Sequence, residues 1–488
     1  MTRWDLIGLA CVLAFGAALT HHLTGGPRGP APMSDPAAQG PGVALGSEWM
    51  GLHFKGERVG LMHLEKTARA QGGGYRYALR TNLRFTALGR AQRIDLQVDA
   101  DLDAALTLEA FDFALGAGPA RLTGHGHVEG RAIELSLDTG GQTATRRIDL
   151  AHPPVLRANL GPVLSQQTLA VGKQFVFHTF DPLTQRDQRV EITVLGRGPL
   201  AVMGREVQAW RLEQRVGGLV LEGWINDRGE MLRQELGMGL VAVRETETEA
   251  RWGLTEARAG RAAPDLMRAT LIEVPGLPPS LAGRARLTLQ VAGLDLAPFK
   301  VDDRRQALGG DTLVITREPV GAGLPLPVRP APEGSLAAEP LIQVGHPAIQ
   351  AAARGAAGDA PDSVAVARRL VAWMQRTLTQ QLVPGVPSAL ETLQTKVGDC
   401  NEHATLFAAL ARSLGVPTRI AVGLVYKDGV FGYHAWNEVL TGDGWLSVDP
   451  TWGQIPADVG HLRLVYGGLD QQVALLGAFG RLKLTVRE

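Results

Sequence analysis

Residues 398–404 read Gly-Asp-Cys-Asn-Glu-His-Ala, and this stretch decides the fold of the C-terminal part of the chain. Asp399 followed three residues later by Glu402 is a capping-box pattern, which predicts a helix that begins at Asp399, with Cys400 in its first turn. Small and apolar residues continue the helix until Gly415. Unpaired backbone N–H groups and the positive end of the helix dipole surround such a first turn. We therefore expect Cys400 to favour the thiolate, the form that attacks a carbonyl carbon.

A β-hairpin is predicted downstream of this helix. Residues 430–449 read as two strands joined by Thr-Gly-Asp-Gly, a strong turn signal. In a symmetric hairpin about that turn, Asp449 lies opposite Trp436, on the same sheet face as His434. Diagonal neighbours of this kind are roughly 7–8 Å apart at the backbone, which is within side-chain reach. His434 is therefore the candidate base for Cys400, and Asp449 the candidate acid that orients the imidazole.

Three motifs in this region resemble those of the transglutaminase-like superfamily. They are Gly-Asp-Cys-x-x-x-Ala at 398–404, His-Ala-Trp-Asn-Glu-Val at 434–439 and Val-Asp-Pro-Thr-Trp at 448–452. Residues 414–419, residues 458–464 and a last strand near 481–486 are also similar to that family, so the resemblance covers roughly residues 344–488. It implies a papain-like fold and acyl transfer through a thioester, with Cys400, His434 and Asp449 as nucleophile, base and acid. Because the superfamily includes transglutaminases, peptidases and amidases, it defines the chemistry better than the substrate.

Further candidates surround this triad. Gln394, six residues before Cys400, resembles in its spacing the oxyanion-hole glutamine of papain-type proteases, and the backbone N–H of Cys400 is the other candidate donor. Trp436 and Trp452 are expected to shape an acyl channel, with a packing role as the alternative. His403 is close to Cys400 in sequence but has no partner acid in view, so we interpret it as structural.

Composition and cysteine usage limit the functional classes. The chain has 488 residues, and its 49 Lys and Arg residues balance its 49 Asp and Glu residues. This zero formal net charge argues against nucleic-acid binding, which needs a concentrated basic surface. The two cysteines are Cys11 and Cys400, so the folded body holds one thiol. An exported protein that keeps an unpaired thiol has either a catalytic use for it or buries it deeply.

The N-terminus predicts export. Residues 6–19 form an apolar run, which is short for a membrane span and typical of a signal peptide. Continued through residue 23, the same run would serve as an uncleaved anchor with membrane association through residues 6–23. We therefore expect a periplasmic protein, or one anchored to the inner membrane and facing outward.

The remaining pattern predicts an α+β protein, in which antiparallel β-rich domains precede the papain-like, transglutaminase-like domain. Strict alternation in segments such as residues 93–99 is typical of strands with one face in water, and six prolines between residues 319 and 340 indicate a linker. Helical spacing follows over residues 363–382. The predicted division is an export segment (1–24), a Gly/Pro-rich spacer (25–46), an antiparallel β domain, curled or open (47–258), a small β domain (259–318), a Pro-rich linker (319–343) and the transglutaminase-like domain (344–488).

The sequence thus favours a cysteine acyl-transfer enzyme that acts on a peptide or carboxamide bond of a protein or peptide substrate. A peptidase or amidase is preferred over a crosslinking transglutaminase because no motif marks an amine site. Two alternatives are a non-catalytic envelope binding protein that retains the fold, and a domain that processes only its own chain. No cofactor and no metal are expected, since His125 and His127 lack a third ligand nearby. The oligomeric state stays open.

Overall fold

The computed structural model describes residues 44–487 except 71–72, 88–89, 118–119, 140–141, 155, 157–159, 166, 182–185, 217–218, 238, 259–269, 300, 340, 382–387 and 468–481. The described residues are mostly antiparallel β, with 52% strand and 16% helix. The described residues form two compact units, one before residue 267 and one after it. The predicted export segment (1–24) and most of the predicted spacer (25–46) lie outside the described residues. Among the helices that are described, none has the length and apolar character needed to span a membrane.

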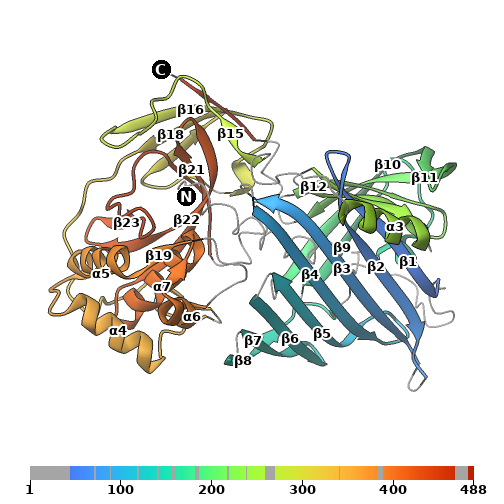
Figure 1. The fold of residues 1–488 in the computed structure, drawn as a ribbon, viewed down its shortest axis with the longest axis horizontal. Coiled ribbons are helices and arrows are strands. Elements are labelled where there is room, and N and C mark those ends of the chain that lie inside the picture. The colour runs from blue at the N-terminus through green and yellow to red at the C-terminus, as the bar shows by residue number, and fades with distance from the viewer. Residues whose placement is uncertain are drawn as a thin grey trace. The chain divides into compact units, whose positions relative to one another are not determined.

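The described part of the N-terminal unit is one 14-stranded antiparallel sheet in the order β8-β7-β6-β5-β4-β3-β2-β1-β14-β13-β12-β11-β10-β9 (Figure 1). Its strands are β1 Gly46–Phe54, β2 Glu57–Ala68, β3 Tyr75–Ala87, β4 Arg90–Leu102, β5 Leu108–Ala117, β6 Ala120–Glu129, β7 Ala132–Thr139, β8 Gln142–Asp149, β9 Gln174–Asp181, β10 Arg186–Val202, β11 Arg205–Val216, β12 Leu219–Ile225, β13 Met231–Gly237 and β14 Leu240–Glu245. The antiparallel sheet predicted from alternation is therefore present in this unit.

This sheet curls, because strands from distant places in its order pack together. The rings of Phe111 on β5 and Phe180 on β9 lie 6.0 Å apart, although nine strands separate β5 from the β9 edge. A core cluster of strands β9–β12 also includes Leu160 and Leu164 of helix α2 (Leu160–Ser165). Curling encloses one apolar face and leaves the other to water, which explains the strict alternation in the sequence.

Two described helices of this unit were not expected, the short helix α2 and a longer one, α3. Helix α3 (Glu247–Arg258) follows β14 directly and packs against β1, β2 and β14. It begins where the side chain of Glu249 reaches back to the backbone N–H of Thr246, at 2.8 Å. The prediction of β structure throughout residues 47–258 was therefore wrong over this segment, because acidic residues in the first turn favour a helix even without a clear apolar period.

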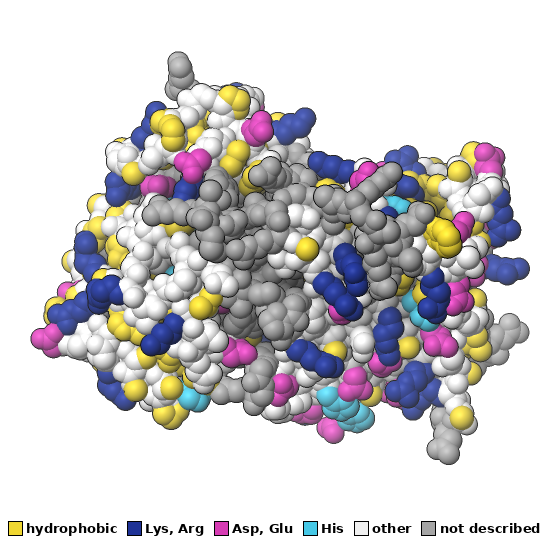
Figure 2. Space-filling view, viewed as in Figure 1, with side chains coloured by type: hydrophobic (Ala, Val, Ile, Leu, Met, Phe, Trp, Pro, Cys, Tyr) yellow, Lys and Arg dark blue, Asp and Glu magenta, His cyan; other side chains and the backbone are white. Residues whose placement is uncertain are grey.

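The surface of the described residues mixes charges of both signs. Figure 2 shows basic and acidic side chains interspersed on the face in view rather than gathered by sign. Cross-strand pairs account for part of this mixing, as between Arg80 and Asp99 or between Arg147 and Glu134, each at 2.8 Å. The distribution agrees with the zero net charge in the sequence.

The C-terminal unit is built on a sheet in the order β15-β22-β21-β24, with β23 paired to β22. The strands are β15 Ile272–Glu273, β21 Thr418–Lys427, β22 Val430–Thr441, β23 Gly444–Val448 and β24 His461–Tyr466. Helix α7 (Cys400–Ser413) packs against β21 and β22, and α4 (Pro347–Ala357), α5 (Ser363–Thr377) and α6 (Ala389–Thr395) pack around α7. Figure 1 shows these four helices gathered together beside the β22 strand. The unit therefore buries α7, as its apolar residues on two sides predict.

Two features of the helical region differ from the sequence analysis. Helix α5 ends at Thr377, earlier than the helical spacing over residues 363–382 predicts, because Leu378 is extended and the chain then pairs as β19 (Thr379–Gln380) with β20 (Val397–Gly398). Helices α4 and α6 were not predicted. The buried face of the first is made of one isoleucine and two alanines, and the second has only seven residues, so few large apolar residues mark either helix in the sequence.

A second sheet in the C-terminal unit has the order β17-β18-β16-β25. Its strands are β16 Arg286–Ala292, β17 Gln306–Gly309, β18 Thr312–Thr316 and β25 Lys483–Val486. The strands predicted near residues 286–290 and 312–315 are thus present, and the last strand of the chain joins them.

The proline-rich segment runs along the same unit. Its backbone hydrogen-bonds to the start of α5, to Gly415 after α7 and to Gly442 in the hairpin turn, at 2.8–3.0 Å. The segment is therefore packed along the helices rather than extended as a spacer. The division into six segments stays a prediction.

Candidate active site

Cys400 is the first residue of α7, as the capping box predicts. The side chain of Asp399 accepts a hydrogen bond from the backbone N–H of Asn401 at 2.9 Å, and Glu402 Oε2 accepts one from the N–H of Asp399 at 2.7 Å. Both halves of the box are therefore formed. They fix the backbone just before the thiol.

Two side chains tie α7 to β22 and so place the thiol beside the histidine strand. Asn437 Nδ2 donates to the backbone carbonyl of Ala404 at 3.0 Å, and the hydroxyl of Tyr433 donates to Asn401 Oδ1 at 3.2 Å. The backbone of Ala435 hydrogen-bonds to the Cys400 sulfur. The nucleophile candidate thus contacts the residue that follows His434.

The hairpin register agrees with the one counted from the sequence. Thr441 pairs with Gly444 and Asn437 with Val448, which places Asp449 one position beyond the last pair. His434 Nε2 lies 3.0 Å from Asp449 Oδ2. The geometric prediction that His434 and Asp449 reach each other is therefore confirmed by this contact.

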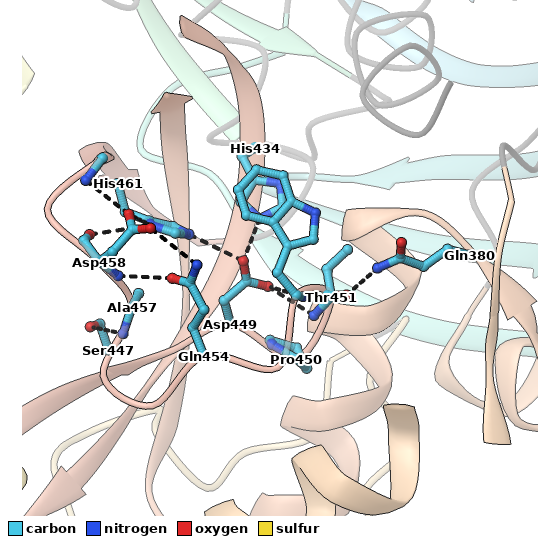
Figure 3. A network of polar contacts seen from close by, with 12 residues as sticks. Gln380, His434, Ser447, Asp449, Pro450, Thr451, Gln454, Ala457, Asp458 and His461 are labelled. Atoms are coloured by element: carbon cyan, nitrogen blue, oxygen red, sulfur yellow. Dashed lines mark hydrogen bonds and ion pairs between the residues drawn. The ribbon is translucent and has the colours of Figure 1, made fainter. Parts of the chain in front are cut away.

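Asp449 is a fully buried carboxylate with four hydrogen bonds. Its Oδ1 accepts from the backbone N–H groups of Thr451 and Trp452 at 2.8 and 3.1 Å. Its Oδ2 accepts from His434 Nε2 and from His461 Nε2, at 3.0 and 3.1 Å (Figure 3). Each oxygen of the carboxylate is therefore held from two directions.

The contact with Asp449 fixes the tautomer of His434. A carboxylate oxygen only accepts, so Nε2 of the neutral imidazole carries the proton and Nδ1 keeps a lone pair. That Nδ1 is buried and has no hydrogen-bond partner among the described residues. Trp452 is half-buried and stacks on the ring, with centroids 4.6 Å apart and planes at 20°. His434 is thereby held as an oriented base with one free lone pair.

His461 is a second histidine in the site. It begins β24, and its Nδ1 lies 3.1 Å from Asp458 Oδ1, while its Nε2 faces Asp449. Two carboxylates on opposite sides of the ring require both ring nitrogens to donate, and only an imidazolium does so. Burial lowers the pKa of His461, but the hydrogen bonds to Asp449 and Asp458 outweigh burial and raise that pKa to about 9. His461 is therefore the charged histidine of the pair.

His434 is the neutral histidine. Burial lowers its pKa below the ordinary 6.5 by more than the Asp449 carboxylate raises it, and the charge on His461 lowers it further. For Asp449, burial acts to raise the pKa, but the contacts with His434 and His461 outweigh it and hold the pKa well below the ordinary range. One buried carboxylate thus faces one cation and one neutral base.

Cys400 differs from the expectation of a stabilised thiolate. Burial raises the pKa of its thiol well above the usual value, and the nearby Asp399 carboxyl raises it further, against a smaller opposite effect of the Ala435 backbone. Only 1% of the residue is exposed, so the loss of hydration outweighs the helix N-terminus. Both shifts therefore favour the neutral form, of the thiol for Cys400 and of the imidazole for His434.

The other predicted residues are spread around the triad. Trp436 is fully buried with its ring 6.1 Å from His434, which is a packing position, whereas half-buried Trp452 covers the imidazole directly. His403 is buried and its Nδ1 lies 2.7 Å from the Asp399 carbonyl. Gln394 is exposed near the end of α6, and its role as an oxyanion donor stays a prediction.

Sequence reasoning did not find His461 or Asp458. Both lie within the segment 458–464 that resembles the family, and a histidine three residues after an aspartate was the available signal. Gln380 was also missed. Its Nε2 donates to the carbonyl of Thr451, just after Asp449, which links β19 to the acid-bearing turn.

The same residues are the candidates for a metal. His434, Asp449 and His461 each offer a donor atom, and these atoms lie within 4.8 Å of one another. However, both Nε2 atoms point at the same Asp449 oxygen at hydrogen-bond distance, an arrangement that protons between the atoms explain. The donor set therefore fits a hydrogen-bonded cluster.

The structure pairs the His434 imidazole with the Asp449 carboxylate and packs their strand against the helix that begins at Cys400. A thiol, an imidazole and a carboxylate are the residue set of cysteine-dependent acyl-transfer chemistry. Residues 350–450 match the model of the transglutaminase-like superfamily. The chain is also similar to solved structures of a candidate cysteine protease from Cytophaga hutchinsonii (16% identity, 42% of this chain and 87% of that one, TM-score 0.28) and of a β-barrel-like protein of a domain of unknown function from Brucella abortus (14%, 41% and 94%, TM-score 0.32). No curated protein matches the chain.

Proposed function

We propose that the C-terminal unit is an α+β, papain-like cysteine enzyme that cleaves a peptide or carboxamide bond through a thioester on Cys400. The single observation that carries the proposal is the state of His434. Its Nε2–H is bound to Asp449, and its buried Nδ1 has no partner among the described residues. A base held in this way is ready to accept one proton from a neighbouring thiol.

The proposed reaction moves one proton between sulfur, imidazole and substrate. His434 Nδ1 takes the proton of the Cys400 thiol as the sulfur attacks the carbonyl carbon. His434 then gives this proton to the leaving amine, and the C–N bond breaks to leave a thioester. In the second half, His434 takes a proton from water, the oxygen attacks the thioester, and the proton returns to the sulfur as the acid is released.

Proton transfer during the attack fits the charges of the site. The raised pKa of Cys400 and the lowered pKa of His434 both disfavour an ion pair at rest. The imidazolium therefore forms only as the reaction proceeds, when Asp449 at 3.0 Å stabilises it. The attraction between Asp449 and His434 is thus strongest once His434 has taken the thiol proton during the attack on the substrate.

Hydrolysis is the proposed fate of the acyl group, with transfer to an amine as the alternative. The test incubates the protein with a glutamine-containing protein, with and without a labelled primary amine, and follows ammonia or peptide release and covalent label. We expect release that is lost in Cys400→Ala and little label. Covalent label that depends on Cys400 would overturn hydrolysis in favour of transamidation, and an unreactive Cys400 would overturn the enzyme itself.

The site of action is part of the proposal. The apolar run at residues 6–19 supports export to the periplasm or the outer face of the inner membrane. N-terminal sequencing of the protein recovered from its cells would separate a cleaved signal from an anchor.

A further inference from the structure

We propose that His461 is a positioning residue for the triad: it fixes the Asp449 carboxylate in the orientation from which that carboxylate aligns His434. The inference rests on the proposed function, since it assigns a role within the same site. The imidazole ring of His461 is fully buried and lies between two carboxylates, with Nε2 3.1 Å from Asp449 Oδ2 and Nδ1 3.1 Å from Asp458 Oδ1. His461 does not need to touch substrate for this role.

The first step of the argument is the geometry of Asp449. Backbone N–H groups of Thr451 and Trp452 hold Oδ1, whereas side chains alone hold Oδ2. Without His461, Oδ2 has one side-chain partner, His434, and the carboxylate and imidazole are free to tilt together. With His461, the oxygen is fixed independently of the residue that it must orient.

The second step is that His461 is itself anchored. Asp458 Oδ1 accepts from the backbone N–H of Gly460 at 2.9 Å, and Asp458 Oδ2 accepts from Gln454 Nε2 at 3.1 Å. Gln454 Oε1 in turn accepts from the backbone N–H of Asp458 at 2.8 Å (Figure 3). Gln454 and Asp458 are therefore bound to each other by two hydrogen bonds within the loop between β23 and β24, and Asp458 in turn holds His461.

The third step is the distribution of charge. The Asp449 carboxylate carries one negative charge and faces two imidazoles, so it compensates only one buried cation. Of the two imidazoles, only that of His461 also faces the second carboxylate, Asp458, and this assigns the cation to His461. His434 is left neutral, with its Nδ1 lone pair available for the thiol proton.

The experiment uses the full chain with Cys11→Ser, so that Cys400 is its single thiol. His461→Gln removes the positive charge of His461 and leaves a single amide group in place of its two ring N–H donors. Asp458→Asn removes the negative charge that holds His461 Nδ1, with little change of side-chain shape. His346→Asn is the matched control, because His346 caps α4 through its ring and asparagine caps equally well. Far-ultraviolet circular dichroism and melting temperature establish that each variant is folded.

We expect His461→Gln to lower kcat by about 10- to 100-fold, the scale of a lost hydrogen bond to a charged group, with KM changed less than threefold. Alkylation of Cys400 by iodoacetamide should slow by a similar factor, Asp458→Asn should show a smaller loss of the same kind, and His346→Asn should match the parent. Folded His461→Gln and Asp458→Asn proteins with unchanged kcat and alkylation rate would overturn the inference, as would a change confined to KM or melting temperature.

A readout that does not depend on catalysis separates the two proposals. The parent protein should show three low-field imidazole N–H proton resonances, one from His434 and two from His461. His461→Gln should remove the two of His461 and shift that of His434. If Cys400 of the parent is inert, the proposed function fails, and this spectrum alone decides the positioning role: an unshifted His434 resonance overturns it.

Discussion

Arg305 connects the small sheet to the loop that carries the site, and its removal is the sharpest test of that connection. The residue lies just before β17, and 6% of its side chain is exposed. Its guanidinium pairs with Glu318, reaches Ser447 Oγ at 3.3 Å and the carbonyl of Ala457 at 3.0 Å, and donates to the carbonyl of Asp458. Arg305→Met keeps the aliphatic stem and removes all of these donors.

The expected cost follows from what remains buried. Glu318 is 4% exposed on its side chain and keeps only the backbone N–H of Ser447, at 2.7 Å, among its contacts described here. Removing one partner of a buried ion pair costs about 3–5 kcal/mol because the other charge is left uncompensated. We therefore expect the C-terminal unit to lose stability by this amount, while the N-terminal unit stays unchanged.

Hydrogen exchange measured by mass spectrometry resolves the two units in one experiment. Amides in peptides from β21 and β22 should exchange roughly 10²- to 10⁴-fold faster in Arg305→Met, the factor that corresponds to this loss. Peptides from β3 and β4 act as the internal control. Arg147→Met is the matched control variant, because its pair with Glu134 is exposed and worth at most about 1 kcal/mol.

The double variant Arg305→Met with Glu318→Gln tests the cause. It removes the stranded charge and leaves an amide oxygen for the Ser447 N–H, so it should recover about half of the lost protection. Unchanged exchange of β21 and β22 in the single variant would refute the role of Arg305. Equal losses with and without Glu318→Gln would refute the electrostatic reason.

Three further predictions follow from the site. Because the pKa of His461 is about 9 in the folded protein and 6.5 in the unfolded chain, protonation of His461 stabilises the fold fully below pH 6.5, and this stabilisation is lost as the pH rises through about 9. The free energy that protects the β24 amides from exchange should therefore fall by about 3 kcal/mol over pH 6.5–9. Protection that does not change with pH would contradict the charged state of His461. Because His434 has a lowered pKa, the acid limb of kcat/KM should lie below pH 6.5, and a limb above 6.5 would show that the neutral assignment is wrong. Gly423→Ala should destabilise the C-terminal unit by about 1–3 kcal/mol and lower kcat, because a Cβ there would lie 2.0 Å from the Leu462 carbonyl and would displace β24 beside His461. Melting temperature and kcat test this prediction. Gly345→Ala is the control, because a Cβ at Gly345 meets no described atom within 4 Å, whereas Gly429 has a positive φ that alanine rarely adopts.

The sequence predicts well those parts of the site that depend on short-range patterns. The capping box at Asp399 needs only a three-residue spacing, and the hairpin register needs only a turn and a period of two. Both place Cys400, His434 and Asp449 correctly in their elements. The end of α5 and the start of α3 were missed because tertiary pairing and capping decide them, and neither leaves a long apolar period in the sequence.

The charge states of the two histidines show why the rest required a structure. His434 and His461 are the same residue type, both are buried, and both donate Nε2–H to the same Asp449 oxygen at nearly equal distance. What separates them is the second carboxylate, Asp458, which faces only His461. That carboxylate is held in its loop by Gln454, while Arg305, about 150 residues earlier in the chain, binds the carbonyl of Asp458. Because a pKa depends on every charge packed against the group, and these charges come from distant segments, no local motif predicts which of the two histidines is charged. The neutral state of His434 therefore depends on the segment that leads into the small β sheet, which carries Arg305, as well as on the hairpin.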